Sequence, residues 1–345
     1  MKRLFKKYTS PSTDNISSIA SLFLAMTIAM AACGDGKSTA PTDEVIFSAD
    51  REGNIDIYKL QGASGDISRL TSAEGKDHSP AWSPKRDIIG FLTDRNGSNE
   101  LWLMDWNGES KRQLSGPGKT ITGFRWAPNS KVIAVEIEET HSRWIGIIDI
   151  ETSELVPITA AEEDVRIGGW SPDAQWLLYA MVNSESDGLR KRNPNGVDEI
   201  TITSGFHTEP IWSPDGRWIA FSQESDQGTS DLIITDNNAE NVVTVNADQF
   251  DETNFEWAPN SKNIVFSSKS SGNADIYTAT PDGKTVKQLT SNRVTDTLPH
   301  WNSDGSSILF LSGKDGIFDL YSMDKNGDQQ KRMTSNFNRI INADW

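Results

Sequence analysis

Short apolar stretches, four to six residues long, recur along the chain from Val45 to its last residue. They are rich in β-branched and aromatic residues, and loops of Gly, Asn, Asp and Ser separate them. No helical periodicity runs through this part of the sequence. The pattern predicts a series of short antiparallel strands and therefore an all-β fold.

These stretches belong to a repeat of about 44 residues. Its marker is a tryptophan that occurs at intervals of 44, 44, 42, 45, 44 and 44 residues, at Trp82, Trp126, Trp170, Trp212, Trp257, Trp301 and Trp345. Six of the seven are followed by a turn such as SPDG or APNS, in which Pro fixes φ at the first corner and Gly or Asn tolerates a positive φ. Three more apolar stretches follow each turn, for example 218–223, 231–236 and 242–245. Four strands at this period are typical of a β-propeller blade.

Counting the strands shows how the ring closes. Residues 45–71 supply three strands with no Trp strand before them, and INADW (341–345) supplies a Trp strand with nothing after it. Joining the two ends gives seven complete blades and removes the open sheet edges that favour aggregation. We therefore predict a seven-bladed β-propeller of four-stranded antiparallel blades over residues 45–345. In it the C-terminal inner strand 341–345 completes the N-terminal three-strand blade 45–71.

The repeat resembles that of the TolB-type propeller family, whose copies read Trp-Ser-Pro-Asp-Gly, an apolar strand, Asp-Ile-Tyr, Asp-Gly and Leu-Thr. PIWSPDGRWIAFS (210–222) and GNADIYTATPDGKTVKQLT (272–290) carry this resemblance, which extends over residues 45–345. It implies a protein that presents a propeller face to another envelope protein or to a peptidoglycan-associated partner. TolB itself has six blades and a separate N-terminal domain. With seven blades expected here, the resemblance is to the family and not to TolB as an orthologue.

The N-terminus predicts a lipoprotein signal. Basic residues precede an apolar run of 14 residues (19–32), which is too short for a comfortable transmembrane helix. The run ends in MAAC, which resembles the lipobox of bacterial lipoproteins and makes Cys33 the lipidation site. Residues 1–32 are then the signal peptide, and 33–44 are the lipidated Cys and a polar tether. The resemblance places the protein in the bacterial cell envelope, and Gly34 next to the Cys favours the outer over the inner membrane.

The charge of the chain narrows the class of partner. The formal net charge is −16 at pH 7, so nucleic acid is not expected as a partner, because phosphate backbones require a cationic face. We expect contact with the membrane through the lipid anchor alone. Cys33 is the only cysteine, which excludes an intramolecular disulfide.

The residues that lead into each Trp strand are the candidate binding residues. Five or six positions before the Trp, five of the seven copies carry an acidic or imidazole side chain, and others adjoin them. The predicted set at the channel mouth is Asp77, His78, Asp164, His207, Glu209, Asp251, Glu252 and Asp296. Such a ring would bind a cation or a basic peptide segment. The alternative interpretation is that each Asp stabilises a loop by bonding backbone amides, as Asp does in turns.

Catalysis is the second class of function that the sequence leaves open. Some seven-bladed propellers that resemble this family are sugar-acid lyases with a cluster of His around a metal. This chain has four His: His78, His141, His207 and His300. His78 and His207 occupy matching positions, and the enzymatic alternative, a carbohydrate lyase or a hydrolase-like propeller, places a divalent metal there. Two converging His without a third ligand are a weak metal signature, so no cofactor is expected.

The fourth repeat departs from the family pattern. SDGLRKRNPNGVDE (186–199) stands where Asp-Ile-Tyr and Asp-Gly are expected, and Arg190, Lys191 and Arg192 form a basic segment on an acidic protein. We interpret it as a solvated loop of a degenerate blade; the alternative is a docking site. The main prediction is thus a non-catalytic protein-binding or scaffold module.

Overall fold

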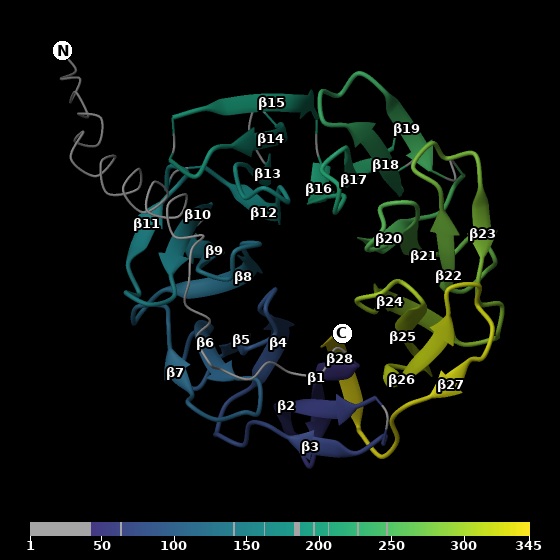
Figure 1. Ribbon diagram of the computed structural model, residues 1–345, viewed down its shortest axis with the longest axis horizontal. Coiled ribbons are helices and arrows are strands. Elements are labelled where there is room, and N and C mark those ends of the chain that lie inside the picture. The colour runs from purple at the N-terminus through teal and green to yellow at the C-terminus, as the bar shows by residue number, and fades with distance from the viewer. Residues whose placement is uncertain are drawn as a thin grey trace, which may run out of the picture.

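The computed structural model describes residues 43–345 with the exception of 63, 141, 162, 183–186, 196, 206, 226–227 and 246–247. The predicted signal peptide, Cys33, most of the tether and His141 therefore lie outside the described residues. Within them, 28 strands form seven four-stranded antiparallel sheets arranged in a ring (Figure 1). The prediction of an all-β, seven-bladed propeller is confirmed. None of the described residues forms a helix with the length and apolarity needed to span a membrane.

Each blade runs from an inner strand near the centre of the ring to an outer strand at the rim. Blade 1 consists of β28 (Arg339–Asp344), β1 (Glu44–Arg51), β2 (Asn54–Gln61) and β3 (Ile67–Arg69). Blade 2 consists of β4 (Asp77–Trp82), β5 (Ile88–Thr93), β6 (Glu100–Asp105) and β7 (Arg112–Gln113). Blade 3 consists of β8 (Thr120–Trp126), β9 (Val132–Glu139), β10 (Ser142–Asp149) and β11 (Leu155–Pro157).

The other four blades follow in chain order around the ring (Figure 1). Blade 4 consists of β12 (Val165–Trp170), β13 (Leu177–Met181), β14 (Gly188–Arg192) and β15 (Glu199–Ser204). Blade 5 consists of β16 (His207–Trp212), β17 (Trp218–Glu224), β18 (Ser230–Asp236) and β19 (Val242–Val245). Blade 6 consists of β20 (Glu252–Trp257), β21 (Ile264–Ser268), β22 (Asp275–Ala279) and β23 (Val286–Gln288). Blade 7 consists of β24 (Thr295–Trp301), β25 (Ser307–Lys314), β26 (Ile317–Asp324) and β27 (Lys331–Arg332).

In blades 2, 4, 5 and 7 the turn after the Trp is held by a side chain as well as by the backbone. In blade 5, Ser213 Oγ donates to Asp215 Oδ1 (2.7 Å) and accepts the backbone N–H of Trp218 (3.0 Å). The fourth turn residue, Gly216, has a φ of 72°, and Arg86 holds the same place in blade 2 with a φ of 57°. The predicted use of positive φ in this turn is therefore confirmed, and the fold imposes it even where the residue is not glycine.

The Leu-Thr pair, or a related pair of an apolar residue and Ser or Thr, ties the outer part of the blade to its third strand in blades 1, 2, 3, 6 and 7. In blade 1 the Thr71 hydroxyl accepts the backbone N–H of Ile57 at 2.9 Å, and in blade 6 Thr290 accepts that of Ile276 at 3.0 Å. The same bond recurs from Ser115, Thr159 and Thr334. Because these hydroxyls are buried, each bond satisfies a backbone donor that the short outer strand leaves unpaired.

The hydrophobic core lies between neighbouring blades. Phe47 and Tyr58 of blade 1 pack with Leu309 and Leu311 of blade 7, and other clusters join blades 3 and 4 or blades 5 and 6 in the same way. One four-stranded sheet buries neither of its faces alone, so the ring is the unit that folds.

The ring closes where the two ends of the described chain meet. β28 pairs antiparallel with β1, with Phe47 opposite Ala343 and Ala49 opposite Ile340. Ile340 and Ala343 are buried in the core that joins blades 7 and 1. The predicted closure of the first blade by the C-terminal strand is confirmed, with the strand extending over Arg339–Asp344.

The interpretation of 186–199 as a solvated loop is wrong for its central part. Residues 188–192 form β14, the third strand of blade 4. Arg190 and Arg192 contact Glu199 at 2.8 and 3.2 Å, and the buried ammonium of Lys191 donates to Asn237 Oδ1 at 2.6 Å. These basic residues therefore form bonds within the protein, and they stabilise a blade that lacks the usual Asp-Ile-Tyr motif.

Candidate functional site: the central channel

Four of the predicted binding residues are buried inside the blades. Asp77, His207, Glu252 and Asp296 all stand five positions before the Trp of their repeat, and none is more than 1% exposed. In the other three repeats this position holds buried apolar residues: Ile121, Val165 and Ile340. The position therefore belongs to the packing of the blade.

The three buried carboxylates have partners within their own blades. Asp77 accepts a hydrogen bond from the guanidinium of Arg95 at 2.9 Å. Asp296 accepts from the amide of Asn292 at 2.6 Å, and Glu252 accepts from the hydroxyl of Ser268 at 3.0 Å. Each of these acids is therefore bonded to a nearby side chain, whereas the alternative interpretation expected bonds to backbone amides.

His207 is a packed core residue in the structure. Its Nε2 lies 2.7 Å from the Thr203 hydroxyl and 3.0 Å from the Ser204 carbonyl, and its ring meets Phe221 edge-on at 4.9 Å. Burial lowers the pKa of His207, with the bond to the Ser204 carbonyl acting in the opposite direction. The imidazole thus favours the neutral form and donates through Nε2.

The other four predicted residues are more accessible but do not form one cluster. His78 contacts the side chains of Ser79 (3.0 Å) and Asn99 (3.3 Å). The remaining three lie in separate blades: Asp164 is paired with Arg166 at 2.7 Å, Asp251 accepts the backbone N–H of Ser230 at 3.0 Å, and Glu209 is exposed. Among residues 43–345 as described, no group of three or more His, Cys, Asp and Glu side chains lies together in a way that would hold a metal ion.

A β-bulge in the inner strands decides which side chains reach the channel. In β4 the pairing with β5 shifts between His78 and Ala81, and β16, β20 and β24 shift at the equivalent place. The residue inside the bulge, three positions before the Trp, has a positive φ in Ser79, Glu209, Asn254 and Leu298. The extra residue reverses the alternation of the strand, so the buried positions are five, two and zero places from the Trp.

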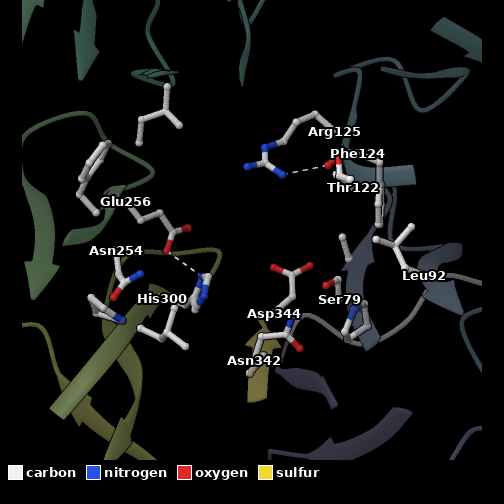
Figure 2. A pocket seen from close by; sticks show the side chains of 18 residues that line it. Ser79, Leu92, Thr122, Phe124, Arg125, Asn254, Glu256, His300, Asn342 and Asp344 are labelled. Carbon is white, nitrogen blue, oxygen red and sulfur yellow. Dashed lines mark hydrogen bonds and ion pairs between the residues drawn. The ribbon is translucent and has the colours of Figure 1, made fainter. Parts of the chain in front are cut away.

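In six of the seven repeats, the residue directly before the Trp consequently lines the channel. A cavity of about 560 Å³ is lined at this position by Ala81, Arg125, Ile211, Glu256, His300 and Asp344. Asn254, Asn342, Ser79 and Thr122 add polar groups to the same lining. Figure 2 shows Glu256, His300 and Asp344 on one side of this space and Arg125 on the other. We call these four residues the channel cluster.

Two carboxylates of the channel cluster are fixed by the neighbouring blade. Glu256 Oε2 accepts the backbone N–H of Trp301 at 3.0 Å and lies 3.1 Å from His300 Nδ1. Asp344 Oδ2 accepts the backbone N–H of Trp82 at 2.7 Å, which links blade 1 to blade 2. Each carboxylate therefore bridges two blades while its side chain faces the channel.

The surroundings of the cluster change its acid–base behaviour. Burial acts to lower the pKa of His300, but the charge and hydrogen bond of Glu256, with the charge of Asp344, outweigh it and raise that pKa. Burial raises the pKa of Asp344, against the bond from Trp82 and the charge of His300. The imidazolium form of His300 therefore persists to higher pH than in a solvated histidine.

Arg125 is the cation of the opposite wall. Its Nη1 donates to the carbonyl of Phe124 at 2.9 Å, and no carboxylate among the described residues lies within ion-pair distance of it. Partial desolvation within the channel lowers the pKa of Arg125, although its side chain is exposed, and the charges of Glu209 and Glu136 act in the opposite direction. A guanidinium has five N–H donors, so most of the hydrogen-bonding capacity of Arg125 is open to the channel.

The channel cluster was not among the residues predicted from the sequence. The signal was present, because the position before the Trp reads Glu256, His300 and Asp344 in three consecutive repeats. The bulge that brings these side chains to the channel leaves no mark of its own in the sequence. Without it, the position five before the Trp is expected on the same face as the position just before the Trp.

The sequence of the chain is similar to those of known propeller proteins. The profile of the TolB beta propeller domain matches residues 36–202 and 208–345. The chain is 32% identical over 188 residues to the Tol-Pal system protein TolB of Gluconobacter oxydans (strain 621H), covering 54% of this chain and 42% of that protein. It is 26% identical over 181 residues to the uncharacterized peptidase YuxL of Bacillus subtilis (strain 168), covering 49% of this chain and 25% of that protein. The matches thus span less than half the length of either relative.

Among solved structures, oligogalacturonate lyase in complex with manganese is similar in fold, with a TM-score of 0.64. Its sequence is 18% identical, and the match covers 83% of each chain. At this identity the likeness shows the propeller fold alone.

Proposed function

The chain belongs to the TolB beta propeller domain family, and on this premise we propose that it is a lipid-anchored, non-catalytic binding module of the bacterial cell envelope. The observation that carries the proposal is the channel cluster, in which Arg125 faces Glu256, His300 and Asp344 across one cavity. Two of its acids are held rigidly by backbone N–H groups, and its guanidinium has no carboxylate partner among the described residues. Such fixed, incompletely paired groups suit recognition.

The partner we propose is an envelope protein or a peptidoglycan-associated molecule that contacts the channel mouth. One relative is named a Tol-Pal system protein, which supports a partner of this kind. We place the contact surface at the channel cluster and not at the eight residues expected from the sequence, because Asp77, Glu252 and Asp296 of that set are buried. Of the original set, Glu209 still acts on Arg125 through its charge.

Reversing the charge of the channel should reduce partner binding. Arg125→Glu is expected to lower recovery of the partner from envelope extracts at least tenfold, because an anion then faces the anionic wall. Arg217→Glu is the matched control, since this guanidinium is 75% exposed on a turn and forms an ion pair with Asp215. Recovery is measured by pull-down with the purified chain. Equal recovery by both variants would contradict the proposal, as would stoichiometric bound metal together with turnover.

The lipid anchor is a separate part of the proposal. Replacing Cys33 with Ser removes the only thiol that could carry a diacylglyceryl group. We expect the variant to leave the membrane fraction and appear among soluble envelope proteins, as measured by fractionation and immunoblotting of cells. An unchanged membrane fraction would mean that the chain is held there by something other than Cys33. The same experiment on separated membranes tests the proposed outer-membrane location.

The second candidate function is an enzyme acting on a peptide or carbohydrate in the channel. The Glu256–His300 pair favours it, because a carboxylate 3.1 Å from an imidazole with a raised pKa is an acid–base pair. This pair replaces His78 and His207 as the centre of that hypothesis, since His207 is packed against Phe221. Turnover by the purified chain that is lost in His300→Gln would favour the enzyme.

A further inference from the structure

The channel cluster separates opposite charges across one cavity. Arg125 comes from β8 in blade 3, whereas Glu256, His300 and Asp344 come from β20, β24 and β28 in the consecutive blades 6, 7 and 1. The same position is uncharged in Ala81 of blade 2 and Ile211 of blade 5, and both line the cavity. In Figure 2, Arg125 and Asp344 both point into the space between the walls. The cavity therefore has a cationic wall and an anionic wall.

Each wall keeps hydrogen-bonding groups for a ligand. Arg125 uses one of its N–H donors on the Phe124 carbonyl. On the anionic wall the backbone donors of Trp301 and Trp82 occupy Glu256 Oε2 and Asp344 Oδ2. The second oxygen of each carboxylate has no hydrogen-bond partner among the described residues. A ligand carboxylate fits the guanidinium fork, and a ligand ammonium fits the two carboxylate oxygens.

The rest of the lining suits a short peptide between the two charged ends. Phe124, Phe255 and Pro299 supply apolar surface, while Asn254 and Asn342 supply amides that can pair with peptide groups. The volume of about 560 Å³ lies within the range of sites for small organic ligands. A longer folded segment would not fit inside such a volume, although a chain end would.

We propose that the channel binds a short peptide zwitterion, with its terminal carboxylate on Arg125 and its terminal ammonium on Glu256 and Asp344. This inference rests on the proposed function, because it requires the channel to be a binding site. It adds the chemical class of the ligand and its direction across the channel. Glu209 lies near the carboxylate end and His300 near the ammonium end, and each has the same sign of charge as the ligand group there, so the two residues limit the affinity for each end.

Isothermal titration calorimetry with three probes tests the inference: trialanine, N-acetyl-trialanine and trialanine amide. The purified chain is expected to bind trialanine, and loss of either terminal charge should weaken binding at least tenfold. Arg125→Gln should bind trialanine as weakly as the parent binds the amide, and amidation should then cost nothing further. Asp344→Asn keeps an oxygen for the Trp82 N–H and should lose most of the effect of acetylation; Glu256→Gln serves if that variant is unstable.

The controls separate this inference from the proposed function. Arg217→Gln should bind all three probes like the parent, and thermal unfolding should show that each variant is folded. The inference is overturned if the parent binds no probe, binds all three alike, or if Arg125→Gln still distinguishes trialanine from its amide. If it fails while Arg125→Glu still loses the envelope partner, the channel is a binding site for other chemistry. If the partner is also retained, the proposed function fails.

Discussion

Deletion of residues 339–345 is expected to abolish cooperative folding of the propeller. These residues include β28, which is the inner strand of blade 1 and the only inner partner of β1. The deletion removes buried Ile340 and Ala343 and the bond from Trp82 to Asp344 that joins blades 1 and 2. It also exposes the edge of β1. Loss of one large buried side chain costs about 2–5 kcal/mol, so the whole strand represents much of a typical stability of about 5–15 kcal/mol.

The measurement is urea unfolding of the truncated chain, with size-exclusion chromatography to detect aggregates. Two single substitutions in the same strand compare a buried residue with a partly exposed one. Ile340→Ala should cost about 2–5 kcal/mol, because this side chain is 1% exposed in the core between blades 7 and 1. Ile341→Ala, at the adjacent partly exposed position, should cost much less. A truncated chain as stable as the parent would show that the ring does not depend on this strand.

Replacing Asp77 with Ala is expected to destabilise the fold by about 3–5 kcal/mol, although the sequence suggested a binding role for this residue. Its carboxylate is fully buried and pairs with Arg95, whose guanidinium also lies over the ring of Trp102 at 4.3 Å. Without the carboxylate, a largely buried cation is left without its ion-pair partner. The loss should appear as a lower urea midpoint.

Asp251 provides the matched control for this substitution. It belongs to the same predicted set, but its side chain is 42% exposed and its nearest cation, Lys269, is 3.9 Å away. Asp251→Ala should change the free energy of unfolding by less than about 1 kcal/mol, as for other exposed pairs. Equal small effects for Asp77→Ala and Asp251→Ala would mean that the buried acids do not hold the blades. That result would again favour a binding role for the acidic residues predicted from the sequence.

The fold was readable from the sequence because each repeat carries its own markers. The Trp, the SPDG-type turn and the Leu-Thr pair each have a separate structural task, shown by Ser213 in the turn and by Thr71 at the outer strand. Seven copies at a nearly constant spacing predict a seven-bladed propeller. The incomplete copies at 45–71 and 341–345 indicate how the ring closes. Local and global signals agree in most repeats, the fourth being an exception, and this agreement is the condition for reliable inference.

The candidate site was harder to read because one added residue changes the face of a strand. A regular alternation would place Asp77 and Ala81 on the same face of the strand. Because a bulge lies between His78 and Ala81, Asp77 is buried in the blade and Ala81 faces the channel. A bulge depends on how the strand pairs with the next strand. No short sequence motif in the strand itself marks this pairing, so the bulge was not predicted. Blade 4 shows the same limit, because Arg190 and Arg192 suggested a solvated loop and instead pair with Glu199 from the neighbouring strand.

Photo-crosslinking in intact cells tests the central claim most directly, namely that the channel is the surface that contacts a partner. p-Benzoylphenylalanine is placed at Thr122, an exposed residue of the cavity lining, and separately at Val242, a residue of the outer strand β19 that is 57% exposed at the rim. We predict a crosslinked partner from Thr122, its loss when Arg125→Glu is added, and none from Val242. Crosslinks from Val242 alone, or a Thr122 product that Arg125→Glu does not change, would contradict the claim.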